Sequence, residues 1–287
     1  MKAIRANETI DDAWLATVEA VTHEPHGQVP HVVTTVTRPV SDDLQKISSD
    51  LEFAEMLEER LLARNPGWQA VDTVAETIFP ASLHRWDGPL WSPDLGDEDG
   101  EAPGDGAEDL FNAYLALLPL IRGAKANRDQ WQDTYFGRLI DWTGTGYNQL
   151  GYWISALRAK RAARITTFKE VNFTLAGEGE LSLGGQLRSS TDRSHLGGPC
   201  LVHLTISLHD SKLHLMANYR HWYLQTRAYG NLVGLSNLLR FVCQQTGYAP
   251  GELVVISGVA NAQHGAPGGA GALRDLIADL QKVGLAQ

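Results

Sequence analysis

The sequence predicts an α+β protein made of a single domain, and three observations support this prediction. Apolar residues recur at helical spacing through most of residues 1–163, whereas segments rich in β-branched residues follow from Arg164 onwards. No internal repeat divides the chain, and 287 residues are enough for one large domain. Because helices and strands occur mostly in separate runs, we expect one sheet with helices packed on it, formed by residues 1–287.

The expected helices carry start and stop signals. Thr9 can cap the first helix, which has acidic residues in its first turn, and Asn65-Pro66-Gly67 ends the second. The helical pattern covers Thr9–Thr22, Leu51–Asn65, Ala70–Ile78, residues 109–122 and 147–163, Asn231–Gln245 and Leu273–Val283.

The expected strands are Val32–Val40, Ile165–Leu175, Cys200–Asp210, Lys212–Tyr223 and Glu252–Asn261. The turn Asp210–Lys212 is short enough to join two of them as an antiparallel hairpin. We therefore expect Cys200, at the start of one strand, and Arg220, near the end of the next, to lie at the same end of this hairpin.

The net charge of −10 comes mostly from one segment. Residues 94–109 carry eight acidic and no basic residues, and without them the net charge of the chain is −2. We interpret residues 92–109, which are rich in glycine and acids, as a solvated surface loop. No stripe of Lys and Arg is present, so strong bulk binding to nucleic acid is not expected.

No apolar run approaches the roughly 20 residues that a membrane-spanning helix needs. The first residues, MKAIRANETIDDAW, lack the apolar core of a signal peptide. We therefore expect a cytoplasmic protein that has no membrane contact.

Two cysteines occur, Cys200 and Cys243. A disulfide is not expected in a reducing compartment, and no Cys or His cluster has metal-ligand spacing, so we expect no metal site. Cys243 lies inside an apolar helix and is expected in the core. Cys200 follows Gly198-Pro199 at a turn that opens a strand, where a thiol can face a cleft as a nucleophile; the alternative is a small buried apolar residue.

Three further residues are candidates, each with a structural alternative. Arg220 can favour a thiolate and bind a phosphate, or it can form a surface salt bridge. Asn231 offers an amide suited to the edge of a pyrimidine ring, or it caps the apolar helix. Glu76 lies in an apolar stretch where burial would raise its pKa for acid–base work, or it lies on a solvated helix face.

The order and spacing of these residues resemble the catalytic half of the thymidylate synthase / pyrimidine hydroxymethylase superfamily. That family carries Pro-Cys-His, a hairpin, Gln-Arg-Ser, and an Asn that opens a long apolar helix ending in Gln-Gln. At matching separations this chain has Pro199-Cys200, Tyr219-Arg220-His221, Asn231 and Gln244-Gln245. Weaker likenesses upstream are Val74-Ala75-Glu76, Phe136-Gly137-Arg138, Asn148-Gln149-Leu150 and Arg164.

The resemblance implies a thymidylate synthase-like fold: a mixed or antiparallel sheet with helices packed on one side, whose other face forms a homodimer. It implies that Cys200 adds to C6 of the ring, that Glu76 organises water and proton transfer, and that Asn231 holds the N3/C4 edge. The family's cytosine-specific members often carry Asp at this position, so Asn231 favours a uracil-type ring.

The same resemblance implies the substrate contacts. Arg220 would bind the 5′-phosphate and lower the thiol pKa, with His221 beside it at the family's serine position. Arg164 would reach the phosphate of a second subunit. Asn261 stands where the family has a sugar-contacting His, and Tyr223 stands where an Asp anchors the pterin of the folate.

Several positions depart from the family pattern. Leu201 replaces the His after the nucleophile, and Ala163 replaces one of an arginine pair; no Arg-Thr-Gly phosphate loop is evident. A glycine-rich loop and a helix replace the C-terminal tail that closes over folate. Methylene-tetrahydrofolate is the expected one-carbon donor, but these changes argue against an ordinary thymidylate synthase.

The leading hypothesis is therefore an enzyme that methylates or hydroxymethylates C5 of a pyrimidine nucleotide. An alternative is a catalytically silent homodimer that binds nucleotides and regulates. A third is cysteine chemistry on an unrelated substrate, with His221 as general base.

Overall fold

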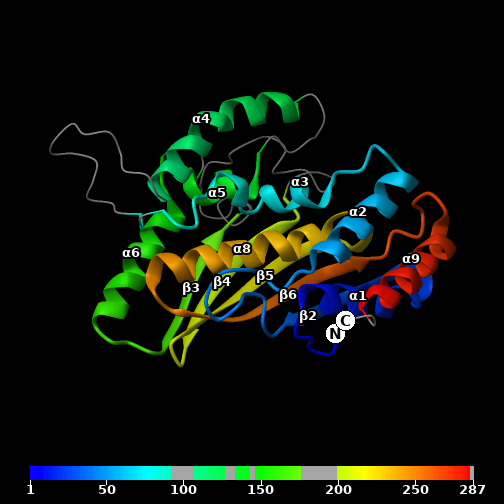
Figure 1. The fold of residues 1–287 in the computed structure, drawn as a ribbon, viewed down its shortest axis with the longest axis horizontal. Helices are drawn as coiled ribbons and strands as arrows, with labels where there is room; N and C mark the ends of the chain where they lie inside the picture. Colours follow the sequence, from blue (N-terminus) through cyan, green and yellow to red (C-terminus); the bar gives the residue numbers. More distant parts are fainter. Residues whose placement is uncertain (89, 92–106, 127–132, 143–145, 176–198, 285–287) are drawn as a thin grey trace, which may run out of the picture.

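The computed structural model describes residues 1–88, 90–91, 107–126, 133–142, 146–175 and 199–284 (Figure 1). They form one six-stranded sheet in the order β1-β2-β6-β5-β4-β3. The strands are β1 (Lys2–Ala3), β2 (Gln28–Val36), β3 (Phe168–Thr174), β4 (Leu201–His209), β5 (Lys212–Tyr223) and β6 (Ala249–Asn261). Pairing is parallel in β1–β2 and β5–β6 and antiparallel elsewhere. The predicted α+β class with a mixed sheet is confirmed.

The predicted helices are confirmed with small changes in their bounds. They are α1 (Ile10–Thr22), α2 (Leu51–Arg64), α3 (Val71–Glu76), α4 (Ala107–Ala126), α6 (Gln149–Ala162), α8 (Tyr229–Thr246) and α9 (Gly269–Gly284). Side chains cap three of them: Thr9 accepts from Asp12, Asp50 from Phe53 and Asn148 from Gly151. α8 ends at Gly247, whose φ of 74° is the left-handed conformation that favours glycine. The short helix α5 (Tyr135–Ile140) was not predicted.

The helices that contact the sheet lie on one of its faces. α8 packs on β5 and β6, and both α1 and α6 contact α8 as well as a strand (Figure 1). Rows of side chains beneath α8 are buried, such as Thr34, Val255, Ala217 and Leu204, which lie side by side on four strands. The core therefore lies between this face and the helices.

The opposite face of the sheet, here called the uncovered face, has no helix packed on it among the residues that the structure describes. Its side chains form neighbouring rows across the central strands, and they are only half-buried although several are apolar. The members are Val33, Thr35, Met216, Asn218, Val254 and Ile256.

α3 and α8 approach each other closely through glycine. A Cβ atom on Gly230 would lie 2.7 Å from the carbonyl oxygen of Val71, and one on Gly234 would lie 2.6 Å from that of Ala75. The two glycines are one turn apart, so they form the strip of α8 on which α3 rests.

Three sequence predictions need correction. The strand predicted at Val32–Val40 begins at Gln28 and ends at Val36, because pairing with β6 stops there. Residues 107–109 of the predicted acidic loop are the first residues of α4, and residues 92–106 lie outside the described chain. A π-helical turn, η4 (Leu224–Ala228), precedes α8, so Asn231 is inside that helix and does not cap it.

Within the described ranges, no helix is long and apolar enough to cross a membrane.

Candidate functional site

The sheet topology gathers most of the candidate residues at one end. β4 begins where β5 ends because the two are antiparallel, and β6 runs parallel to β5. Cys200, directly before β4, therefore lies at the same end as Arg220 in β5 and Asn261 in β6. Gln28, the first residue of β2, pairs with Asn261 and extends this edge.

Cys200 is half-buried and is held from both sides. Its carbonyl oxygen accepts a 2.9 Å hydrogen bond from the backbone N–H of Arg220, and the Arg220 side chain hydrogen-bonds its thiol. The phenol oxygen of Tyr135 accepts from the N–H groups of Cys200 and Leu201 at 3.2 and 3.3 Å. The predicted proximity of Cys200 and Arg220 is confirmed.

The thiol does not have the lowered pKa that the arginine alone would produce. Burial raises the pKa of Cys200, and this outweighs the opposite effects of the Arg220 and Arg227 guanidinium groups. The expectation of a lowered thiol pKa is therefore wrong for the protein without a ligand. At neutral pH the group is therefore a neutral thiol, and the two nearby cations only partly offset the effect of burial.

A line of buried aromatic groups joins the cysteine to Asn231. The phenol of Tyr219 is fully buried, and the proximity of Cys200 and Tyr135 adds to the burial that raises its pKa. Its ring stacks on Trp222 at 5.9 Å between centroids, and the indole Nε1 of Trp222 donates to Oδ1 of Asn231 at 3.2 Å. Because an indole N–H only donates, the atom facing it must be the amide oxygen, which fixes the orientation of Asn231.

His221, Tyr223 and Asn261 form the next group along the edge. The amide nitrogen of Asn261 lies 3.4 Å from Nε2 of His221, and its oxygen accepts from the N–H of Gln263 at 2.7 Å. Nε2 of His221 must then accept, so the imidazole is neutral and carries its proton on Nδ1. Burial and the charge of Arg220 lower the pKa of His221, which favours this neutral form. The ring of Tyr223 lies 4.4 Å from that of His221.

Glu76 ends α3 and is half-buried. Its carboxylate accepts from the N–H and the hydroxyl of Ser82 at 3.0 and 2.9 Å, and burial raises its pKa. Among the described contacts, none joins it to Cys200. The predicted raised pKa is confirmed, whereas a shared cleft with the cysteine stays a prediction.

Arg164 lies far from this edge. It follows α6 and precedes β3, whose first residue, Phe168, pairs with Leu208 near the far end of β4. The nine residues of β4 separate the two ends by about 26 Å, at roughly 3.3 Å per residue. Arg164 is exposed, and within one chain it cannot reach Cys200.

Two residues of this site were not anticipated. Tyr135 holds the strand start that carries Cys200, and its contact partners are 65 and 66 positions away in the chain. Arg227 in η4 acts on the thiol as a second cation and is hydrogen-bonded to Gln69. The sequence offered a weak signal only for Tyr135, which is next to the Phe136-Gly137-Arg138 motif.

In that motif, Arg138 has a structural role. It is fully buried, and its guanidinium donates to the carbonyl oxygen of Leu175 at 2.7 Å and lies 3.7 Å from Asp133. The Gln244-Gln245 pair likewise fixes chain segments: Gln244 binds His84 and Trp86, and Gln245 binds Trp91. The residues of these two motifs therefore hold in place the chain segments that they contact, and their role here is structural.

No cluster of three or more His, Cys, Asp or Glu side chains with metal-binding geometry is found in the part of the chain that the structure describes. A comparison with models of known protein families finds no match for this chain, and a comparison with curated proteins also finds none.

Proposed function

We propose that this protein transfers a one-carbon unit, as a methyl or hydroxymethyl group, to C5 of a pyrimidine nucleotide. The observation that carries the proposal is the hydrogen bond between the half-buried Cys200 thiol and the Arg220 guanidinium. The two residues occur in the order and at the spacing that the thymidylate synthase superfamily has. Methylene-tetrahydrofolate is the proposed donor, with Tyr223 as a proposed contact of the folate.

In the proposed chemistry, the sulfur of Cys200 adds to C6 of the ring, and the electron pair of the C5=C6 bond makes C5 a carbon nucleophile. Arg220 stabilises the thiolate that forms and binds the anionic phosphate. The hydrogen bond from Arg220 to the thiol supports the first role, and the partial exposure of Arg220 near the end of β5 supports the second.

A uracil-type ring fits the orientation of Asn231. Trp222 already donates to the amide oxygen, so the group that remains to be offered is the amide NH₂. An NH₂ donor matches the O4 acceptor of uracil and opposes the N4 donor of cytosine.

We further propose that two chains form a homodimer through the uncovered face of the sheet. Half-buried Val33, Val254 and Ile256 on this face support the proposal, because apolar side chains on a sheet favour burial. Arg164 supports it too, since only a second chain could bring this arginine to a nucleotide at Cys200. Light scattering should show a dimer that Val254→Lys dissociates, while Leu51→Lys, at an exposed position, leaves it intact.

A silent nucleotide-binding homodimer is the second candidate, and two observations favour it. Burial raises the pKa of Cys200, and the Glu76 carboxylate is bonded to Ser82. A binding protein needs the arginines and Asn231, whereas an enzyme also needs an ionised thiol.

Alkylation of Cys200 by iodoacetamide tests occupancy of the site. UMP, dUMP, CMP and dCMP are added in turn, and mass spectrometry follows the Cys200 peptide, with the buried Cys243 as internal control. We expect one uracil nucleotide to protect Cys200. Protection by none of the four would overturn both candidate functions. Debromination of the matching 5-bromo nucleotide then separates the enzyme from the binding protein.

A further inference from the structure

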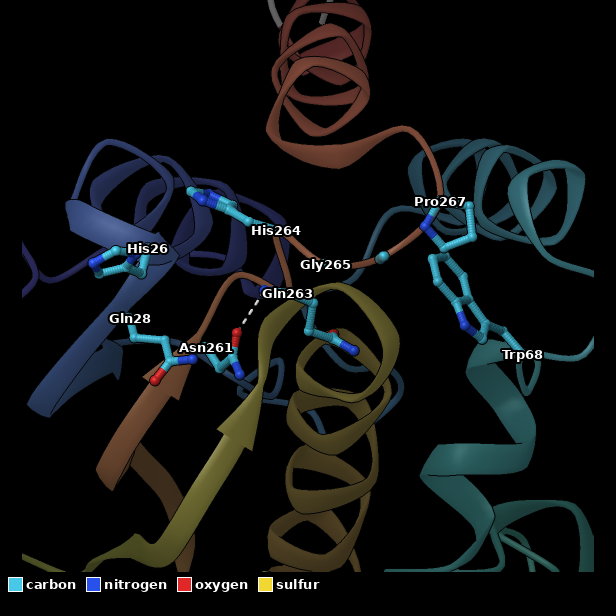
Figure 2. A pocket seen from close by; sticks show the side chains of 9 residues that line it. His26, Gln28, Trp68, Asn261, Gln263, His264, Gly265 and Pro267 are labelled. Atoms are coloured by element: carbon cyan, nitrogen blue, oxygen red, sulfur yellow. Dashed lines mark hydrogen bonds between the residues drawn. The ribbon is translucent and has the colours of Figure 1, made fainter.

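A pocket of about 420 Å³ opens at the same end of the sheet as Cys200 and Arg220. Figure 2 shows His26 and Gln28 on one side of it and Trp68 on the other, with Asn261 and Gln263 between them. The remaining lining residues belong to the loop that follows β6. They are His264, Gly265, Ala266 and Pro267.

The walls of the pocket contain backbone conformations that L-residues rarely adopt. His26 and Gln263 have φ angles of 59° and 56°, and they come from different elements. Between them, Gly27 (φ 62°) leaves room for the His264 ring, whose Nε2 lies 2.5 Å from where a Cβ would be. Such conformations cost free energy and persist only where the surrounding structure holds them. They are concentrated at binding and active sites.

Hydrogen bonds hold the loop of the pocket in place from outside. Nη2 of Arg64 donates to the carbonyl oxygen of Pro267 at 2.8 Å, and its Nη1 donates to Gln225 at 3.0 Å. Gln225 in turn donates to the carbonyl oxygen of Gln263 at 3.2 Å, and Thr226 donates to the side-chain oxygen of Gln263 at 3.1 Å. The pocket is therefore formed before any ligand arrives.

The described residues of the lining are mostly polar, and none of them carries a carboxylate, ammonium or guanidinium group. Carboxamides of Gln28, Asn261 and Gln263 and imidazoles of His26 and His264 supply its polar groups, and Trp68 supplies a flat apolar wall. Lys, Arg, Asp and Glu are absent from this lining as far as the structure describes the chain. A carboxamide both donates and accepts, as each hydroxyl of a sugar does, so the lining suits a neutral ring that carries neighbouring hydroxyl groups.

The position of the pocket relative to Cys200 agrees with that chemistry. Its Asn261 contacts His221, the residue after Arg220. In a pyrimidine nucleoside, the C6 that a cysteine attacks is bonded to N1, which carries the sugar. A ring seated on Cys200 therefore directs its sugar to a site directly beside the cysteine.

We propose that this pocket binds the sugar of the nucleotide and selects a ribose, through its 2′,3′-diol, over a 2′-deoxyribose. The inference rests on the proposed function, and it names the substrate as a ribonucleotide. In this proposal the side-chain amide of Gln28 distinguishes the ribose from the 2′-deoxyribose. The side-chain oxygens of Asn261 and Gln263 already accept hydrogen bonds from backbone N–H groups of the protein.

The test measures the dissociation constants of UMP and dUMP by calorimetry, on the full chain and on two variants. We expect UMP to bind about tenfold more tightly than dUMP, the ratio that one net hydrogen bond supplies. Gln28→Ala should bring the two constants together. Gln45→Ala, in an exposed turn far from the pocket in sequence, should leave the ratio unchanged. Trp68→Ala should weaken the binding of both nucleotides, because the sugar of each would lose the apolar wall that the indole forms.

Equal affinities for UMP and dUMP in the unaltered chain would overturn the ribose selection, and so would an unchanged ratio in Gln28→Ala. In either case, protection of Cys200 from alkylation by both nucleotides leaves the proposed function standing. If neither nucleotide binds and none protects Cys200, the proposed function and this inference fall together.

Discussion

The backbone N–H of Arg220 donates a 2.9 Å hydrogen bond to the carbonyl oxygen of Cys200, and the side chains of the same two residues are hydrogen-bonded to each other. The hairpin of β4 and β5 thus brings a guanidinium to a thiol that lies 20 positions earlier in the chain. The arginine works against burial, which raises the pKa of the thiol, so the reactivity of Cys200 depends on the balance of the two.

Replacing Arg220 should shift that balance towards the neutral thiol. Arg220→Gln removes the largest of the influences that lower the pKa of Cys200, so the pKa should rise further. The pH dependence of iodoacetamide alkylation measures it. Arg227→Gln should shift the midpoint in the same direction but less, and Arg38→Gln on the surface should not shift it. A midpoint that falls in Arg220→Gln would contradict the described geometry.

Tyr135 should stabilise the start of β4. Tyr135→Phe leaves the N–H groups of Cys200 and Leu201 without their acceptor, at a cost of roughly 1–3 kcal/mol. Urea unfolding should show this loss, and the two amides should exchange hydrogen faster. Tyr152→Phe, which alters an exposed ring, is the matched control. Unchanged exchange at both amides would show that the phenol does not hold this strand.

The close packing of α3 on α8 predicts different effects for two glycines. Gly234→Ala places a Cβ 2.6 Å from the carbonyl oxygen of Ala75, so we expect a destabilisation of about 1–3 kcal/mol. Gly271→Ala in α9 meets nothing within 4 Å and should stabilise the protein by roughly 0.5–1 kcal/mol. Thermal unfolding compares the two variants. Equal effects of the two substitutions on stability would mean that α3 and α8 do not pack this closely at Gly234.

Asp11 should make stability depend on pH in a defined window. Burial raises its pKa to about 6, although Tyr229 and the N–H of Asp50 donate to its carboxylate at 2.7 and 2.9 Å. Because the pKa is higher in the folded protein, the contribution of this group to stability is complete at low pH and is lost as the pH rises from about 4 to about 6.

Asp11→Asn removes this titration. The stability of the variant relative to the unaltered protein should therefore increase between pH 4 and pH 7, by a difference of the order of 1–3 kcal/mol. Urea unfolding at several pH values measures it, with Asp42→Asn, at an exposed position, as control. A difference that does not vary with pH would contradict the raised pKa of the half-buried Asp11 carboxyl.

The sequence was sufficient to predict the elements whose pattern is local. Apolar periodicity and caps such as Thr9 and Asn148 define the helices, and the short turn at Asp210–Lys212 predicts that Cys200 and Arg220 meet. The end of β2 at Val36 depends on pairing with β6, which is far away in the chain. The local sequence pattern therefore did not predict this end of the strand.

The properties of the site depend on burial and on distant contacts. The raised thiol pKa results from burial in the folded chain, and the orientation of Asn231 results from Trp222 on another element. Tyr135 and Arg227 reach Cys200 only because the fold brings separate segments together. Residue order therefore indicated which candidate residues lie close together, but not the electrostatic state of their side chains.

The central claim is that Cys200 adds to C6 of a pyrimidine ring, and debromination tests it most directly. The 5-bromo forms of UMP, dUMP, CMP and dCMP are incubated with the protein and an added thiol, without folate, and mass spectrometry follows the products. Once Cys200 has added to C6 and C5 has gained a proton, the added thiol removes the bromine from C5, and a second thiol molecule converts the resulting S–Br group to a disulfide and HBr. The electron pair left at C5 then expels Cys200 and leaves the uracil nucleotide, so no one-carbon donor is needed. We predict that a bromouracil nucleotide is debrominated and that Cys200→Ser abolishes the reaction. Binding of the nucleotides without any debromination, or debromination that persists in Cys200→Ser, would contradict the claim.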